Sequence, residues 1–140
     1  MEYLVMKSRD ALIRASTFDL AEKRRKLTDL DGMMAEFRRM ALDLEQQIEA
    51  EHVRTGVREP THFAYSSFAK AARKRCDTLL ESVADLSRKR DTAIADVTAA
   101  EDDVKRMQLA GDRASEERPH AGRRPSRTRL MGLGTSSRGV

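Results

Sequence analysis

The feature that most constrains this chain is an apolar repeat whose steps alternate between three and four residues. It runs from residue 13 to residue 48. A repeat of 3.5 residues keeps one narrow apolar stripe on a helix and is typical of coiled coils. The sequence therefore predicts a helix over about residues 8–53, capped by Ser8 and stopped by Gly56. The predicted core positions of this helix are Leu27, Leu30, Met34, Phe37, Leu44 and Ile48.

A second stripe with the same spacing follows Pro60 and predicts a helix over about residues 66–111, capped by Ser66 or Ser67. Each narrow stripe must be buried on another helix, and the break between them, at about residues 54–65, is short. We therefore predict an all-α fold: an antiparallel two-helix coiled-coil hairpin over residues 1–111, with a tip loop between the helices. The predicted core positions of the second helix are Cys76, Leu79, Val83, Leu86, Val97 and Val104.

The sizes of the facing residues predict the register of the hairpin. An a position of one helix faces a d position of the other, and dense packing favours a large residue opposite a small one. A register centred on Pro60 meets this condition, whereas sliding it by one heptad sets Phe37 against Arg90. The predicted layers include Ile48 with Ala72, Leu44 with Cys76, Phe37 with Val83, Met34 with Leu86, and Leu27 with Ala93.

Two layers of this seam contain a charged residue, because Arg90 faces Leu30 and Lys23 faces Val97. In one interpretation, the apolar stems of both side chains lie on the seam while their charges reach water. In the other, the half of the hairpin near the chain ends pairs weakly or is available to a partner.

Composition excludes several classes of function. Charged residues make up 36% of the chain and aromatic residues 4%, a profile of solvated helices rather than of a layered enzyme core. No apolar run is long enough to span a membrane, and the start lacks a secretory signal pattern. The single cysteine excludes an intramolecular disulfide and fits a reducing cytoplasm. Because no nucleotide loop, paired-cysteine motif or nucleophilic arrangement occurs, we expect no catalytic residue, no cofactor and no small-molecule substrate.

Histidines and aromatic residues gather near the predicted tip. His52 and His62 could hold a metal ion, but we interpret them as solvated loop residues and expect no metal. Phe63, Tyr65 and Phe68 either cap the end of the seam, the interpretation we favour, or form a patch that binds a peptide. Among these aromatic residues, the candidate partner-binding residues are Phe63 and Tyr65.

A basic run on the first helix provides the other candidate partner-binding residues, Lys23, Arg24, Arg25 and Lys26. The run wraps around the helix, and nearby acids can neutralise it through contacts three and four residues away. A solvated coiled-coil surface is therefore the simpler interpretation. The alternative is a surface that docks on an acidic partner.

The last part of the chain, residues 112–140, has a different composition. It holds seven Arg against three acidic residues, which accounts for the whole net charge of +4. Arg, Gly, Ser and Pro dominate it without any period, so we predict a disordered tail. Such a tail attracts phosphate weakly, although it has no aromatic residue on which bases could stack.

Three stretches together resemble the flagellar export protein FliJ family, the coiled-coil stalk of type III export that is also similar to YscO. They are MKSRDALIR at residues 6–14, AEKRRK at 21–26 and HFAYSSFAKAA at 62–72. The resemblance covers about residues 6–110, and it leaves either Met1 or Met6 as the initiator. The tail departs from the family pattern and is either a natural extension or the product of a shifted reading frame.

The resemblance implies a non-enzymatic component of the bacterial flagellar type III protein export apparatus. Its partners would be the export ATPase hexamer, the export gate membrane protein and export chaperones. The helix termini would enter the ATPase ring, with Lys23–Lys26 near it. The implied location is cytoplasmic, peripheral to the inner membrane at the flagellar base, with a role in motility. The alternatives are a generic coiled-coil scaffold or tether, or a weak nucleic-acid binder acting through the tail.

Overall fold

The computed structural model describes residues 2–116, and every structural statement below refers to them. It contains two long helices, α1 (Glu2–Thr55) and α2 (Ser67–Glu116), which pack against each other. No strand occurs among these residues. The predicted all-α hairpin is thereby confirmed. The chain divides into two units: a tip unit, residues 19–100, and a terminal unit, residues 2–18 together with residues from 101 onward.

Both helices are longer than the sequence patterns predicted. α1 begins at Glu2 instead of near Ser8, because no residue in this first stretch breaks a helix and the Glu2 carboxylate lies at the positive end of the helix dipole. α2 continues through Gly111 to Glu116. The prediction of disorder from residue 112 is therefore wrong for residues 112–116, and the rest of the predicted tail lies outside the described residues.

Gly111 lies inside α2, where it faces α1. A Cβ at this position would lie 3.5 Å from Cδ of Arg9 and 3.7 Å from Cδ1 of Ile13. Nearby, the Ser16 hydroxyl donates a hydrogen bond to Sδ of Met107 (2.9 Å). Val104 is the buried residue of the terminal unit. The two distances from a Cβ at position 111 are ordinary van der Waals contacts, so the packing of this unit would also accommodate an alanine there.

The ends of the helices at the tip loop are fixed by local hydrogen bonds. Gly56 has a φ of 74°, and its N–H donates to the carbonyl oxygen of His52 (2.9 Å), which is the left-handed helix end that glycine accommodates best. At the start of α2, the backbone N–H of Ala69 donates to the Ser66 hydroxyl oxygen (3.1 Å). Of the two serines that could cap α2, Ser66 does so.

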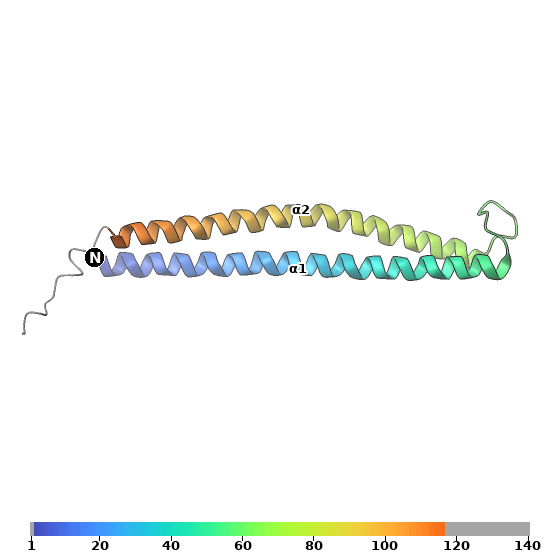
Figure 1. Ribbon diagram of the computed structural model, residues 1–140, viewed down its shortest axis with the longest axis horizontal. Helices are drawn as coiled ribbons and strands as arrows, with labels where there is room; N and C mark the ends of the chain where they lie inside the picture. The colour runs from blue at the N-terminus through green and yellow to red at the C-terminus, as the bar shows by residue number, and fades with distance from the viewer. Residues whose placement is uncertain (1, 117–140) are drawn as a thin grey trace, which may run out of the picture. The chain divides into compact units, whose positions relative to one another are not determined.

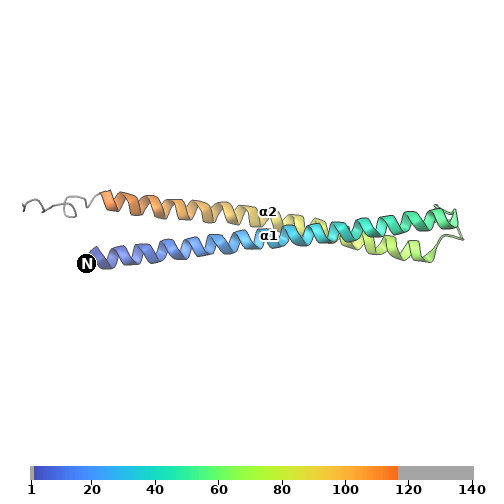
Figure 2. The same cartoon turned by 60° about the horizontal axis from the view of Figure 1, so that its bottom comes forward.

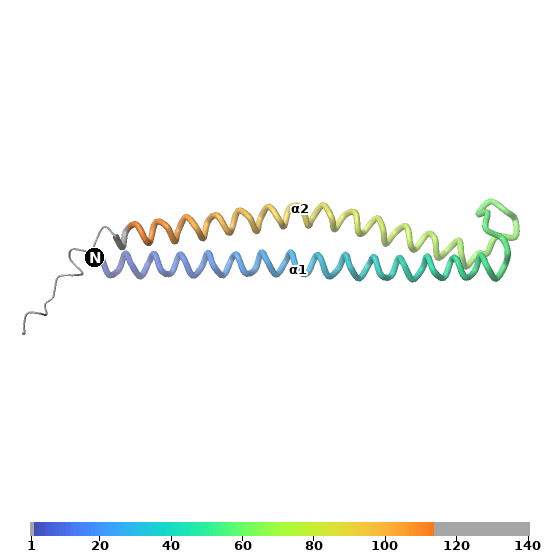
Figure 3. The backbone as a smooth tube through the Cα atoms, viewed as in Figure 1, coloured from blue at the N-terminus to red at the C-terminus, as the bar shows by residue number. Residues whose placement is uncertain are grey.

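The core of the tip unit consists of two apolar clusters between the helices. Within this unit α1 and α2 run side by side in opposite directions and cross one another, and the loop joins them (Figures 1, 2 and 3). Both clusters combine residues of the two helices. The first, the small-residue cluster, contains Ala41, Leu44, Ile48, Ala69, Ala72 and Cys76, with Tyr65 and Leu79 packed against it. The second, the large-residue cluster, contains Leu30, Met34, Val83, Leu86 and Ala93, with Leu27 and Phe37 packed against it.

These clusters agree with the register predicted from side-chain size, since each of the five layers named above has both of its members in one cluster. Cys76 also reaches α1 directly, where its thiol donates to the carbonyl oxygen of Ala41 (3.6 Å). The predicted core residues differ in burial. The buried ones are Leu30, Met34, Leu44, Ile48, Cys76, Val83, Leu86 and Val104, and the half-buried ones are Leu27, Phe37, Leu79 and Val97.

The two charged residues of the seam extend toward solvent. The side chain of Arg90 is 39% exposed, and its Nε donates to the Asp31 carboxylate across the helix pair. The side chain of Lys23 is 37% exposed, and its ammonium lies 2.9 Å from Oδ1 of Asp19. Both side chains therefore follow the first interpretation, in which the stem lies on the seam and the charge reaches water.

Candidate functional site

The basic run on α1 is largely engaged with acidic residues of its own helix. Lys23 pairs with Asp19 (2.9 Å) and Arg25 pairs with Glu22. The hydrogen bond and the charge of Asp19 raise the pKa of Lys23, and Glu22 raises the pKa of Arg25 in the same way. Such exposed pairs stabilise a helix only slightly. The run is therefore an exposed and largely neutralised surface of the tip unit.

A second group of polar residues fastens the tip loop to the end of α1. The Glu51 carboxylate accepts hydrogen bonds from the Arg54 guanidinium (2.9 and 2.7 Å) and from the Ser66 hydroxyl (2.5 Å). The hydrogen bonds from Arg54, and to a lesser extent that from Ser66, lower the pKa of Glu51 to about 2. Because Ser66 also caps α2, the Glu51 carboxylate connects the end of one helix to the beginning of the other.

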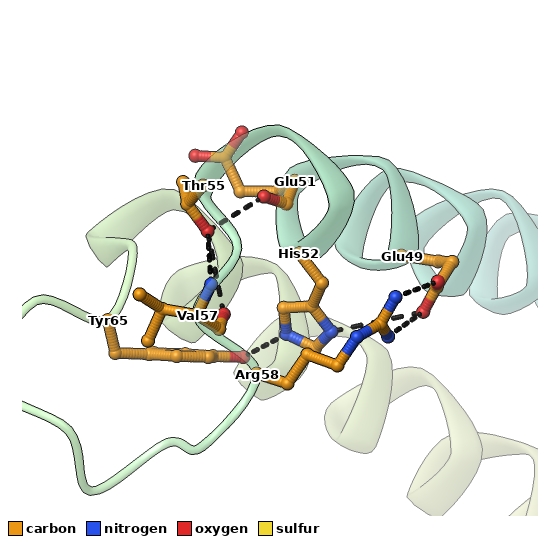
Figure 4. A network of polar contacts seen from close by, with 7 residues as sticks. All are labelled: Glu49, Glu51, His52, Thr55, Val57, Arg58 and Tyr65. Carbon is orange, nitrogen blue, oxygen red and sulfur yellow. Dashed lines mark hydrogen bonds and ion pairs between the residues drawn. The ribbon is translucent and has the colours of Figure 1, made fainter.

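Two further contacts join the loop residues Arg58 and Tyr65 to α1 (Figure 4). The Arg58 guanidinium donates two hydrogen bonds to the Glu49 carboxylate (2.9 and 2.8 Å), and these lower the pKa of Glu49. Nε2 of His52 lies 2.7 Å from the Tyr65 hydroxyl. Tyr65 is half-buried and packs against the small-residue cluster. The loop is therefore fixed at both ends by side chains of α1.

These contacts leave a hollow of about 200 Å³ beside the tip loop, which we call the tip hollow. Its lining is mostly apolar, and Lys70 and Arg73 of α2 add two positive charges. The full lining consists of Ile48, His52, Pro60, Tyr65, Lys70 and Arg73. Sequence reasoning named Tyr65 but missed the hollow, because it forms only when the loop folds back over the end of α1.

The aromatic residues of the tip do not act as a group. Tyr65 packs on the seam, but Phe63 is 96% exposed and stacks on His62, with ring centroids 4.7 Å apart. Phe68 is 50% exposed. The interpretation that all three aromatic residues cap the seam is therefore wrong for Phe63 and Phe68. Their side chains point away from it because they lie on the loop and on the outer face of the first turn of α2.

An apolar surface of the terminal unit also escaped the sequence reasoning. Leu12 is 56% exposed and Leu109 is 58% exposed. A further hollow of about 240 Å³ in this unit has a mostly polar lining, because Arg9, Asp10, Gln108 and Asp112 line it together with Met6, Ile13 and Gly111. The sequence signal that could have revealed this surface is the presence of leucines, such as Leu12 and Leu109, outside the a and d positions of the heptad repeat. The exposed apolar residues of this unit, here together called the terminal patch, are Tyr3, Leu4, Val5, Met6, Leu12, Phe18 and Leu109. The four consecutive residues 3–6 lie on different sides of α1, because each residue of a helix is turned by about 100° from the one before it.

The groups with potential for chemistry lie apart from one another or are engaged. The Cys76 thiol is fully buried, and burial raises its pKa. Nδ1 of His62 accepts a hydrogen bond from the backbone N–H of Ala64 (2.9 Å). Across residues 2–116, His, Cys, Asp and Glu side chains do not gather in any group of three that could hold a metal ion. Neither described helix has an apolar stretch that could cross a membrane.

The sequence and the structure were compared with protein-family models, curated proteins and solved structures, and none of the three comparisons gave a match.

Proposed function

We propose that this protein is a non-enzymatic, stalk-like coiled coil of the bacterial flagellar type III export apparatus, similar to FliJ. In this role its terminal unit docks into the export ATPase hexamer. The protein works in the cytoplasm, peripheral to the inner membrane at the flagellar base, and also engages the export gate and export chaperones. It changes the activity of the ATPase through contact and takes no part in nucleotide chemistry.

The observation that carries this proposal is the terminal patch. Among residues 2–116, seven apolar side chains of the terminal unit are exposed, and exposed apolar surface near one end of a molecule is a common feature of interaction sites. The patch lies on the helix ends that the resemblance to FliJ assigns to the ATPase ring. The basic run at Lys23–Lys26 has a lesser part in the proposal, because Asp19 and Glu22 already neutralise two of its charges.

The direct test measures ATP hydrolysis by the purified hexamer of the cognate export ATPase with and without this protein. We expect the wild-type protein to raise the rate. Leu12→Gln should weaken the effect, because a leucine that becomes buried on binding contributes about 1.5–3 kcal/mol, or roughly tenfold or more in affinity. Leu42→Gln is the matched control, since Leu42 is 53% exposed, close to the 56% of Leu12, but lies in the tip unit.

Two outcomes would contradict the proposal. One is the absence of stimulation together with a failure of the ATPase and the export gate protein to co-purify with the wild-type chain. The other is an equal loss for Leu12→Gln and Leu42→Gln, which would point to a general effect on the helices. Melting curves of both variants establish whether the fold is retained.

A further inference from the structure

We propose that the tip hollow binds an acidic peptide segment that carries an apolar side chain next to a carboxylate. The hollow has a volume of about 200 Å³. An apolar protein cavity of about 150 Å³ accommodates a benzene molecule, so one phenylalanine or leucine side chain fits here. This site lies in the tip unit, and the proposal stands independently of the docking of the terminal unit to an ATPase.

The apolar part of the hollow is preformed. Ile48 is only 3% exposed and belongs to the small-residue cluster, so it provides a fixed wall. Tyr65 provides another wall, and its ring is held in place because its hydroxyl lies 2.7 Å from Nε2 of His52. Pro60 closes the loop side. A guest side chain would therefore enter a surface whose order has already been established by folding, which reduces the entropic cost of binding.

The positive charge on the lining favours a ligand that carries a carboxylate. Among residues 2–116, the Lys70 ammonium has no ion pair or hydrogen bond. The Arg73 guanidinium has acidic neighbours only at the outer limit of an ion pair, namely Glu45 at 4.0 Å and Asp77 at 3.9 Å. The unpaired Lys70 ammonium beside an apolar wall is complementary to a carboxylate attached to an apolar group. Arg73, whose charge Glu45 and Asp77 share, adds further hydrogen-bond donors on the same wall.

The acidic residues at the end of α1 do not pair with Lys70. The Glu49 carboxylate accepts both of its hydrogen bonds from Arg58. Glu51 is held by Arg54 and Ser66. The carboxylates of α1 nearest the loop are therefore already matched by loop and helix groups, while the Lys70 ammonium on α2 remains for a ligand.

The experiment uses the full-length protein labelled with ¹⁵N and follows its amide NMR signals during titration. The probes are 3-phenylpropionate, its neutral analogue 3-phenylpropanol, and an acetylated pentapeptide with one phenylalanine between aspartates. We expect the phenylpropionate and the peptide to shift the signals of His52, Tyr65 and Lys70 in a saturable way. The neutral alcohol should bind more weakly, because it lacks the carboxylate.

Variants separate this site from general electrostatic attraction. Lys70→Gln and Arg73→Gln should each weaken peptide binding about two- to fivefold, and together about tenfold. Lys74→Gln is the matched control, because it makes the same change of charge on an exposed neighbouring residue of α2 outside the lining. All three residues are exposed or only loosely paired, and circular dichroism checks that the helices persist.

Several results would overturn the proposal. They are the absence of saturable shifts at millimolar probe, equal binding of the alcohol and the carboxylate, or an equal loss for Lys74→Gln. Displacement of the peptide by oligothymidylate would also overturn it, because the site would then recognise negative charge alone, as a nucleic-acid surface does.

Discussion

A disulfide between positions 44 and 76 tests the register of the helix pair most directly. Cys76 is the single cysteine of the chain and shares the small-residue cluster with Leu44. Ala41 and Ala72 in the same cluster allow the helix backbones to approach closely, as a disulfide requires. We therefore expect the Leu44→Cys variant to form an intramolecular disulfide under mild oxidation.

The energetic effect has two parts. Truncating Leu44, which is 8% exposed, should lower the stability of the reduced variant by about 1–3 kcal/mol. Closing a loop of about 30 residues with the disulfide removes entropy from the unfolded chain and restores about 3–4 kcal/mol. The oxidised variant should therefore melt about 10 °C or more above its own reduced form, and end close to the wild-type protein.

Non-reducing gels and thiol titration measure the extent of cross-linking, and circular dichroism follows melting with and without a reductant. Leu42→Cys is the matched control, because Leu42 lies on the same helix but is 53% exposed. Phe37→Cys tests the register displaced by one heptad. Efficient intramolecular cross-linking of either control, or failure of Leu44→Cys to cross-link, would refute the register.

Three further predictions concern stability. Leu86→Ala should destabilise the protein by about 2–3 kcal/mol in urea unfolding, because Leu86 is 6% exposed, whereas Leu80→Ala, at a residue 43% exposed, should cost less than about 1 kcal/mol. Gly32→Ala should stabilise α1 by about 0.5–1 kcal/mol, since a Cβ there meets nothing within 4 Å. Gly56→Ala should destabilise the protein by about 1 kcal/mol, because the φ of Gly56 is 74°. The pKa of Glu51 is lowered from 4.5 to about 2, so its stabilising effect is complete above pH 4.5 and lost as the pH falls toward 2. Melting curves should therefore separate Glu51→Gln from wild type at neutral pH and converge near pH 2; a constant difference would contradict this assignment.

The heptad repeat was sufficient to predict the pairing of the helices, because a narrow apolar stripe has few ways to leave water. Side-chain size then predicted layers whose members share one cluster, such as Met34 with Leu86. The helix ends were less predictable. Gly111 matched a common stop signal, yet α2 passes through it and ends at Glu116.

The candidate sites depended on contacts that a periodic pattern does not contain. Tyr65 and Phe63 are two residues apart and both aromatic, but one packs on the seam and the other is 96% exposed. The loop path that separates them follows from bonds such as those from Arg58 to Glu49, across nine positions of the chain. The heptad repeat specifies none of these irregular contacts, so the tip hollow could not be foreseen.

The buried position of Cys76 also makes its thiol a probe of helix separation. Its sulfur is fully covered between the helices, and an alkylating reagent reaches a thiol only after its cover has moved aside. The alkylation rate of the Cys76 thiol would then report how often the two helices separate beside it. Binding of a partner that holds the helices together would lower this alkylation rate. The natural cysteine can therefore report assembly without an added label.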